Sequence, residues 1–372
     1  MLSKKLIILI GALAGVFGAL AGVYAFLFAA PGPSAEREQF TVAIGKDDSR
    51  EVAAALAELG FIKSSFGFRL AFFGVRGASA IICIDCIQPG AYKLSKSMSA
   101  FAIAQVLKKD PYMKWVAIPE GWRKEQIAER LARELGWSGA DKRKWVSDYT
   151  AMEYDYVEGV YFPDTYLIPT DEKPLDVAER LRTRFDEQFA PYAQEALDQN
   201  IKWTTIVTLA SLIQREAGGA DDMPLIAGIL WSRLLQGMKL DIDATLQYAR
   251  DSEIAYADLC KAAGSDEPYQ CQCADEPVAC YRREGFYKGL EEWWRAPDAS
   301  DKQIESEYNT YRRQGLPPHP IANPGIGAIE AVLFPEETNC LFYLHDKYKQ
   351  IHCSKTYAGH LENIETYLRS SL

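Results

Sequence analysis

The stretch LASLIQREAG, residues 209–218, carries the most informative pattern in this chain. Read as a helix, with about 100° between successive residues, it gathers three apolar residues on one face: Leu209, Leu212 and Ile213. Glu216 falls on that same face. Desolvation disfavours the ionised form of a carboxyl group, so we expect a raised pKa for Glu216. A carboxyl that keeps its proton near neutral pH can act as a general acid.

Glu216 also has a purely structural interpretation. A glutamate at a helix end can pair with a cation such as Arg233 or accept hydrogen bonds from the backbone. The pKa of a carboxyl group is shifted both in catalytic sites and in structural ion pairs, and the sequence pattern by itself does not separate these two cases.

The sequence on either side of this segment also predicts helices, so we expect longer helices in the C-terminal part of the chain. The periodicity predicts helices near 175–189, 204–217 and 224–237, the last with Pro224 in its first turn. The main domain boundary falls near residue 170. Residues 252–306 are polar, rich in cysteine and weakly periodic, which is typical of a surface insertion or a long loop. We therefore expect a domain over 171–372 with an insertion over 252–306.

The N-terminus has the composition of a membrane anchor. Residues 6–30 carry no charged side chain, and Lys4 and Lys5 precede them. A run of this length can cross a hydrocarbon core of about 30 Å. The lysines predict a cytoplasmic tail over 1–5, so the chain after a linker at 31–39 would lie outside the cytoplasm. A cleaved signal peptide is the alternative.

Two similar segments follow the linker. Residues 40–61 and 114–137 both predict a strand, a turn and a helix that ends at a glycine, Gly60 or Gly136. A further helix is predicted near 99–108. We expect an N-terminal α+β module over 40–110 and a second module, similar to LysM glycan binders, over 111–170. Such units also serve as spacers.

Eight cysteines favour an oxidising compartment over the cytosol. Cys340 and Cys353 flank a predicted hairpin, and we expect a disulfide between them; Cys83 with Cys86 is a weaker prediction of the same kind. Four further cysteines cluster in the polar stretch, where disulfides are favoured over a zinc site and the pairing stays open: Cys260, Cys271, Cys273 and Cys280.

Charge and motifs exclude several classes of function. A net charge of -10 argues against a nucleic-acid partner, because phosphate binding needs a basic surface. The chain has no phosphate-binding glycine loop, no HExxH and no GxSxG motif. Its histidines, at 319, 345, 352 and 360, do not have the spacing that places two ligands on one helical face. We expect no cofactor and no metal.

Six motifs in one order resemble a known family. They are VAIPEGWRKEQIAERLA (116–132), VEGVYFPDTYLIP (157–169), LASLIQREAG, PLIAGILWSRLLQGMKLDIDATLQYA (224–249), YNTYRRQGLPPHPIANPGIGAIEAVLFP (308–335) and SKTYAGH (354–360). These motifs and the apolar N-terminus make the chain similar to the MltG/YceG-like endolytic murein transglycosylases. The resemblance implies an α+β fold: an N-terminal transmembrane helix, LysM-like strand–helix subdomains and a C-terminal YceG-like catalytic domain.

The resemblance also implies an activity and a site. Such an enzyme sits in the inner (plasma) membrane by a single helix and cleaves the MurNAc–GlcNAc bond of nascent peptidoglycan glycan strands, leaving anhydro-muramoyl ends. Cell-wall synthases, the penicillin-binding proteins, would be its partners. The catalytic glutamate, first acid and then base, maps to Glu216. Substrate-binding positions map to Asp243, Thr245, Tyr248, Asn309, Thr310 and Tyr311.

Some residues depart from the family pattern, and two other functions stay open. Asp241 and Ala244 stand where the family often has glutamine and proline, which puts a sugar contact at Asp241 in doubt. A muramidase would use Glu216 with Asp243, because glycosidases usually need two carboxylates. A non-catalytic scaffold would bind glycans and recruit synthases without needing Glu216.

Overall fold

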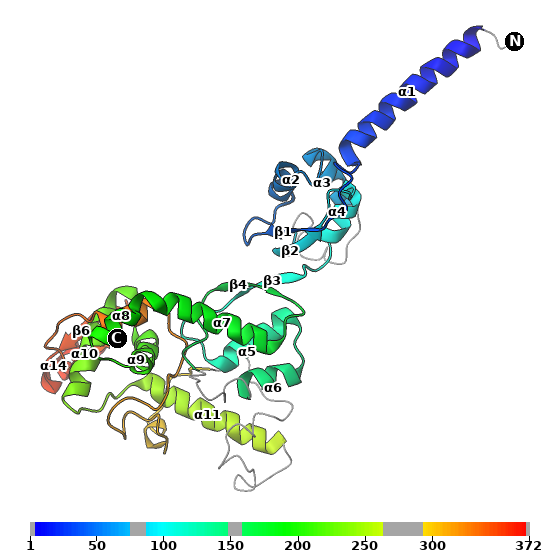
Figure 1. Cartoon of the computed structure of the whole chain (residues 1–372). Coiled ribbons are helices and arrows are strands. Elements are labelled where there is room, and N and C mark those ends of the chain that lie inside the picture. Colours follow the sequence, from blue (N-terminus) through cyan, green and yellow to red (C-terminus); the bar gives the residue numbers. More distant parts are fainter. Residues whose placement is uncertain (1–3, 75–86, 148–157, 263–292, 370–372) are drawn as a thin grey trace. The chain divides into compact units, whose positions relative to one another are not determined.

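The structure is a computed structural model that describes residues 4–74, 87–147, 158–262 and 293–369. The chain divides into two compact units, coloured by sequence in Figure 1. The first comprises residues up to 116 together with 166–171, and the second comprises 117–165 and 172–372. The fold mixes helices and strands, as the sequence predicts.

The first unit is built on a four-stranded sheet in the order β1-β2-β3-β4, with β1 Glu38–Val42, β2 Gly90–Leu94, β3 Met113–Ala117 and β4 Thr165–Pro169. β1 and β2 are antiparallel, with Phe40 opposite Tyr92. The two strand–helix segments seen in the sequence therefore contribute β1 and β3 to one sheet. The helix that follows β1 belongs to the first unit, whereas the helix that follows β3 belongs to the second.

Three helices pack beside this sheet: α2 Ser49–Glu58, α3 Ser65–Gly74 and α4 Ala100–Leu107 (Figure 1). α2 begins after Asp48, whose carboxylate accepts a hydrogen bond from the Arg50 amide, and α4 begins after Ser99, whose hydroxyl accepts one from the Ala102 amide. Such caps satisfy amides that have no partner within the helix. The apolar faces of the helices bury the core of this unit against the sheet.

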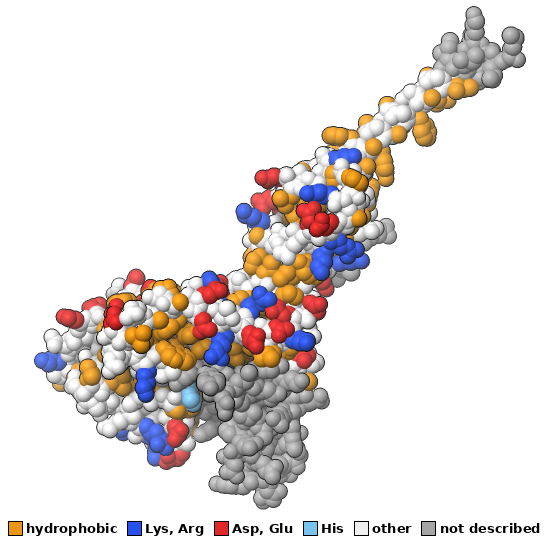
Figure 2. Space-filling view, in the orientation of Figure 1, with side chains coloured by type: hydrophobic (Ala, Val, Ile, Leu, Met, Phe, Trp, Pro, Cys, Tyr) orange, Lys and Arg blue, Asp and Glu red, His pale blue; other side chains and the backbone are white. Residues whose placement is uncertain are grey.

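α1, Lys4–Phe28, is the expected apolar helix. The stretch Leu9–Phe28 has a mean hydropathy of 2.0 and none of it is buried inside the protein. Figure 2 shows hydrophobic side chains along the length of this helix. Its last turn contacts α3 closely: a Cβ added at Gly67 would lie 2.1 Å from the Leu27 carbonyl oxygen. One helix thus has the length and composition of a single-pass anchor.

The second unit is mostly helical. Its main helices are α5 Lys124–Leu135, α6 Gly139–Ser147, α7 Pro174–Phe189, α8 Ala193–Asp198, α9 Trp203–Glu216, α10 Met223–Leu235, α11 Asp243–Ala262, α13 Ile326–Leu333 and α14 Tyr357–Asn363. Short turns of 3-10 helix cover 190–192, 220–222 and 301–303, and a π-helical turn covers 364–369. α9 lies at the centre, where its residues 206–213 are all buried.

The C-terminal hairpin pairs β5, Phe342–His345, with β6, Ile351–Ser354. Tyr343 stands opposite Cys353, and a disulfide joins Cys340 to Cys353, which confirms that predicted pair. Cys83, Cys86, Cys271, Cys273 and Cys280 lie outside the described residues, and the side chain of Cys260 is not described either.

The expectation of irregular structure from residue 252 onward was wrong at its start, because α11 continues to Ala262. The end of that range also packs into the unit: Trp293 and Asp301 are buried. Weak periodicity misled the prediction here, because α11 buries polar side chains such as Arg250 and Asp251 in an ion pair.

Candidate active site

A cavity of about 490 Å³ opens in the second unit at the C-terminal end of α9. Glu216, Asp241, Asp243 and Tyr311 line it with Arg233 and Lys302. The remaining wall comes from the hairpin and the C-terminal helices, through Phe342, Tyr343, Leu344, Tyr357, His360, Ile364 and Leu368. Three carboxylates and two cations thus face one space beside aromatic rings, a lining suited to a polar ligand with apolar faces.

Glu216 is the last residue of α9 and is half-buried. Its Oε2 accepts a hydrogen bond of 2.9 Å from the hydroxyl of Tyr343. Burial raises the pKa of the Glu216 carboxyl; the Tyr343 hydrogen bond and the Ala244 amide lower it, and the negative charge of Asp243 raises it. The balance is a raised pKa, as the apolar face of the helix predicts.

Arg233 does not pair with Glu216. Its Nε donates to the Leu341 carbonyl and its Nη1 to the Leu240 carbonyl, each at 2.6 Å. These bonds join α10 to the segments before β5 and α11. Of the two structural roles that the sequence left open for Glu216, the ion pair with Arg233 is therefore not observed, whereas the hydrogen bond from the backbone is present at the Ala244 amide.

Asp243 and Tyr311, both assigned to the cleft by resemblance, meet in this cavity. The Tyr311 hydroxyl donates to Asp243 Oδ1 at 2.7 Å, across 68 positions of sequence. Burial raises the pKa of Tyr311, and the hydrogen bond to Asp243 raises it further. Two carboxylates in the cavity, those of Glu216 and Asp243, therefore each accept a hydrogen bond from a tyrosine hydroxyl.

Thr245, Asn309 and Thr310 are buried and do not line the cavity. The hydroxyls of Thr245 and Thr310 lie 2.9 Å apart, and Thr310 accepts from the Ile242 amide. Asn309 donates to the carbonyls of Lys302 and Ile304. These contacts fix the backbone that presents Asp243 and Tyr311, while a direct contact with substrate stays a prediction.

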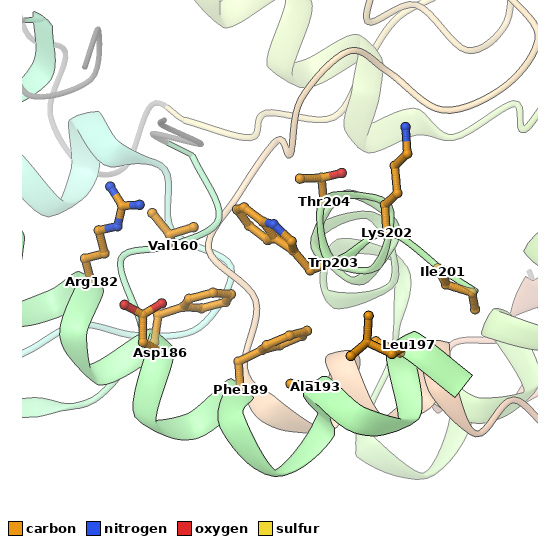
Figure 3. Close-up of a pocket in the computed structure, with 12 residues that line it drawn as sticks. Val160, Arg182, Asp186, Phe189, Ala193, Leu197, Ile201, Lys202, Trp203 and Thr204 are labelled. Atoms are coloured by element: carbon orange, nitrogen blue, oxygen red, sulfur yellow. The ribbon is translucent and has the colours of Figure 1, made fainter. Parts of the chain in front are cut away.

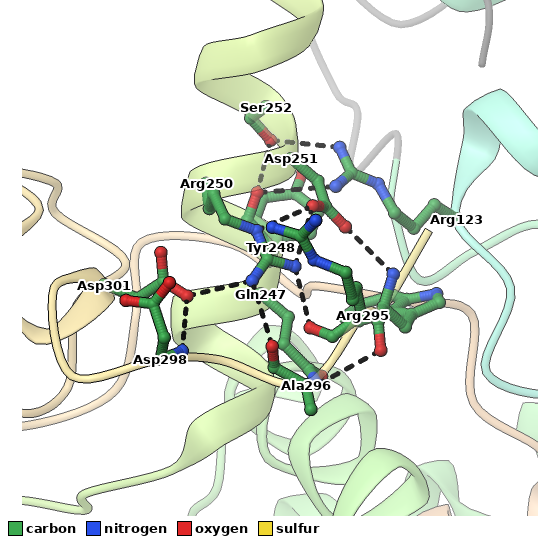
Figure 4. A network of polar contacts seen from close by, with 11 residues as sticks. Arg123, Gln247, Tyr248, Arg250, Asp251, Ser252, Arg295, Ala296, Asp298 and Asp301 are labelled. Atoms are coloured by element: carbon green, nitrogen blue, oxygen red, sulfur yellow. Dashed lines mark hydrogen bonds and ion pairs between the residues drawn. The ribbon is translucent and has the colours of Figure 1, made fainter. Parts of the chain in front are cut away.

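Tyr248 lies elsewhere in the unit, in the polar network of Figure 4. The guanidinium of Arg123 stacks on its ring and donates to its carbonyl and to the Ser252 hydroxyl. Arg123 is fully buried and forms an ion pair with Glu125 at 3.0 Å. The network joins α11 to the start of α5, so the structure places Tyr248 in the packing between helices.

Two groups near Glu216 were not predicted from the sequence. Tyr343 and His345 alternate along β5, and the His345 Nε2 lies 2.6 Å from Asp222 Oδ2. Asp222 also accepts from the amides of Gly218 and Gly219. The turn after Glu216 is thereby held to the hairpin. The period of two in FYLH could have indicated that both side chains share one face.

A second cavity of about 490 Å³ lies at the opposite end of α9, where Trp203 begins the helix (Figure 3). Phe185, Phe189 and Trp203 form much of its wall, with Arg182, Asp186 and Lys202 at its polar positions. Its lining contains one carboxylate, Asp186, whereas the cavity at Glu216 contains three. The chemistry of proton transfer therefore points to the cavity at Glu216.

The sequence profile of the YceG-like family matches residues 40–366, which includes every residue of the Glu216 cavity up to Ile364. The chain belongs to the YceG-like family. This confirms the resemblance seen in the six motifs.

Curated relatives of this YceG-like chain carry the name endolytic murein transglycosylase. The protein from Bacillus subtilis is 27% identical over 341 residues, covering 86% of this chain and 82% of that protein. The protein from Streptococcus pneumoniae is 23% identical over 319 residues, and the chain spans 52% of that relative's length. A crystal structure of a YceG-like protein from Listeria monocytogenes aligns with 88% of this chain at 22% identity and a TM-score of 0.49.

Proposed function

We propose that this YceG-like protein is an endolytic peptidoglycan transglycosylase that cleaves the MurNAc–GlcNAc bond with Glu216 as its acid and base. The observation that carries the proposal is the Glu216 carboxyl, with its raised pKa, in a cavity lined by polar and aromatic side chains. Family membership and the names of the curated relatives support the substrate class.

The reaction needs one proton donor that later becomes a proton acceptor. Glu216 gives its proton to the glycosidic oxygen as the bond from that oxygen to the anomeric carbon breaks. The C6 hydroxyl oxygen of the same muramoyl residue then bonds to the anomeric carbon, and its proton passes to Glu216. No water is consumed, and the carboxyl ends in its starting state. Intramolecular attack supplies the proximity that a second enzyme group would otherwise provide.

Hydrolysis is the second candidate, because Asp241 and Asp243 line the same cavity. A muramidase would use one carboxyl as acid and a second as base or nucleophile. Asp243 already accepts a hydrogen bond from the Tyr311 hydroxyl, which stabilises its carboxylate and makes it a weaker base. This contact weakens the case for Asp243 as a second catalytic group, so transglycosylation is the better supported reaction.

The nature of the product ends decides between these reactions. Uncrosslinked glycan strands are digested with the full-length protein in detergent, and the fragments are analysed by mass spectrometry. Anhydro-muramoyl ends, lighter than reducing ends by one water, are the expected result. Reducing ends would identify a muramidase. Intact strands that nevertheless bind the protein would favour a glycan-binding scaffold.

We further propose that α1 anchors the protein in the inner (plasma) membrane with residues 31–372 on the extracytoplasmic side. The apolar surface of Leu9–Phe28 and the two lysines before it support this orientation. The LysM-like nature of the strand–helix segments and the cell-wall synthases as partners belong to the same proposal, whereas the predicted boundary near residue 170 differs from the two compact units, which place 117–165 with 172–372. Protease treatment of spheroplasts should degrade the protein from outside; a mature N-terminus near residue 31 would instead identify a cleaved signal.

A further inference from the structure

We infer that Tyr343 is a positioning residue that directs the acidic proton of Glu216 to Oε1 and stabilises the carboxylate formed when that proton leaves. The inference rests on the proposed function and names a residue from a different element. Tyr343 lies on β5, 127 positions after Glu216, and its hydroxyl donates to Glu216 Oε2 at 2.9 Å.

In this pair the Tyr343 hydroxyl is the donor and Glu216 Oε2 is the acceptor. Burial raises the pKa of Tyr343 well above its usual value, and the negative charge of Glu216 raises it further. The phenol therefore keeps its proton throughout the pH range of activity, and that proton is directed at Oε2. An oxygen that accepts a hydrogen bond in this direction is a poor place for a second proton, so the transferable proton of Glu216 resides on Oε1.

The same bond acts on both halves of the reaction. When Oε1 gives up its proton, the negative charge spreads over both oxygens, and a donor on Oε2 stabilises that charge. When the carboxylate later takes a proton back, Tyr343 still holds the carboxyl in place. The phenol proton itself is not transferred, and no bond of Tyr343 is made or broken.

Other charged and titratable groups around Glu216 set the background for this effect. Asp243 at the start of α11 disfavours the carboxylate, and the charge of His345 on β5 favours it. Arg215 precedes Glu216 in α9, and Tyr311, Arg233 and Asp241 share the cavity. Within the described residues, Tyr343 supplies the side-chain hydrogen bond to Glu216, so removal of its hydroxyl deletes that hydrogen bond and leaves the surrounding charges in place.

The hairpin gives Tyr343 a rigid support. Tyr343 is paired with Cys353, and the Cys340–Cys353 disulfide closes the same hairpin. Two positions on, His345 contacts Asp222, which holds the amides of Gly218 and Gly219 just after Glu216. Both partners in the Tyr343–Glu216 bond are thus fixed from the same strand, as a positioning role requires.

The test compares Tyr343→Phe with Tyr348→Phe in the full-length protein. Phenylalanine keeps the ring and removes only the hydroxyl. Tyr348 lies in the turn of the same hairpin, is 74% exposed and does not line the cavity, so its variant is the matched control. Rates of anhydro-muramoyl formation are measured across pH with glycan strands of defined length.

Tyr343→Phe should lower kcat about 10- to 100-fold, the factor that corresponds to a hydrogen bond to a charged group. KM should change less than about twofold, because only the reacting carboxyl is affected. The loss of activity at alkaline pH should move to higher pH by about one pH unit, since the carboxylate has lost its donor. Tyr348→Phe should match the unmodified enzyme in all three measurements.

Difference infrared spectroscopy supplies a readout that does not depend on turnover. The carboxyl band that disappears in Glu216→Gln is titrated with and without the Tyr343 hydroxyl, and Tyr343→Phe should raise its midpoint. An unchanged midpoint and an unchanged alkaline limb would overturn the inference, even with a low kcat. If no variant cleaves glycans while the infrared midpoint still shifts, the proposed function fails and the positioning role of Tyr343 stands.

Discussion

The guanidinium carbon of Arg123 lies 4.2 Å from the ring centroid of Tyr248, with the whole arginine side chain removed from solvent. Glu125 compensates its charge at 3.0 Å, and Glu125 is itself buried. Removal of one member of a buried ion pair leaves the other charge without compensation, which is more costly than the pair is stabilising.

Arg123→Met should therefore lower the free energy of unfolding by about 3–5 kcal/mol. Tryptophan fluorescence during urea unfolding measures it, because Trp293 also packs on Arg123. Arg133→Met is the matched control, since Arg133 pairs with Glu134 at the surface and should change stability by less than about 0.5 kcal/mol. Equal effects of the two substitutions would contradict this account of the network.

The buried carboxyl of Glu158 should make the stability of the fold depend on pH. Its Oε1 accepts from the Lys124 amide and from Asn323, while Oε2 has no hydrogen-bond partner among the described residues. Burial raises the pKa of Glu158 well above its usual value, and the charge of Glu125 raises it further. The folded protein then binds a proton that the unfolded chain has released, so stability falls as pH rises from the ordinary glutamate range to the raised pKa.

Glu158→Gln should remove this contribution, because glutamine resembles the protonated carboxyl and keeps an acceptor for Lys124 and Asn323. The unmodified protein and the variant should have similar unfolding free energies below the ordinary pKa of glutamate. As pH rises above that value, the variant should become more stable than the unmodified protein by a growing margin. The margin should stop growing once the pH passes the raised pKa of Glu158 in the folded protein. Parallel stability curves across this range would argue that Glu158 is ionised in the folded state.

The disulfide of the C-terminal hairpin should stabilise the catalytic unit. A double Cys340→Ala, Cys353→Ala variant should lose about 2–4 kcal/mol, the usual effect of a natural bridge. Differential scanning calorimetry of both proteins measures the loss. Activity should also fall, because β5 carries Tyr343. Non-reducing peptide mapping of the unmodified protein should recover the two cysteines in one linked fragment; recovery of both as free thiols would refute the bridge.

Glu216→Gln tests the acid directly. Glutamine keeps the volume and can still accept from Tyr343, so the melting temperature should stay close to that of the unmodified protein. It cannot give a proton to the glycosidic oxygen, and cleavage should fall at least about a hundredfold. Glu58→Gln, at an exposed position of α2, is the control. Normal release of anhydro-muramoyl ends by Glu216→Gln would place the acid elsewhere, with Asp243 the first candidate.

Local signals were sufficient for much of the fold. Gly136 ends α5 with a φ of 74°, a left-handed conformation that favours glycine, as the sequence indicates. The limits of α7, α9 and α10 agree within about two residues with those predicted, because each helix has a regular apolar face. The disulfide follows from two cysteines, Cys340 and Cys353, that flank the opposed strands of a predicted hairpin.

Long-range contacts explain what the sequence left undecided. Thr245 and Thr310 belong to motifs that resemblance assigns to substrate, yet their hydroxyls face one another across 65 positions in the core. The place of a residue in a motif does not show whether its side chain contacts the substrate or holds the backbone of the site. Tyr343 presents the opposite case: its part in the site depends on a partner 127 positions away.

The position of Glu216 at the last residue of α9 has a further consequence. The aligned peptide dipoles of a helix place about half a negative elementary charge at its C-terminal end, an effect worth about 0.3–1 kcal/mol on a nearby charge. The field of the backbone itself therefore opposes ionisation of this carboxyl. Side-chain substitutions in the cavity can strengthen or weaken the acid, but they cannot remove this contribution. Only a change in where α9 ends would do so.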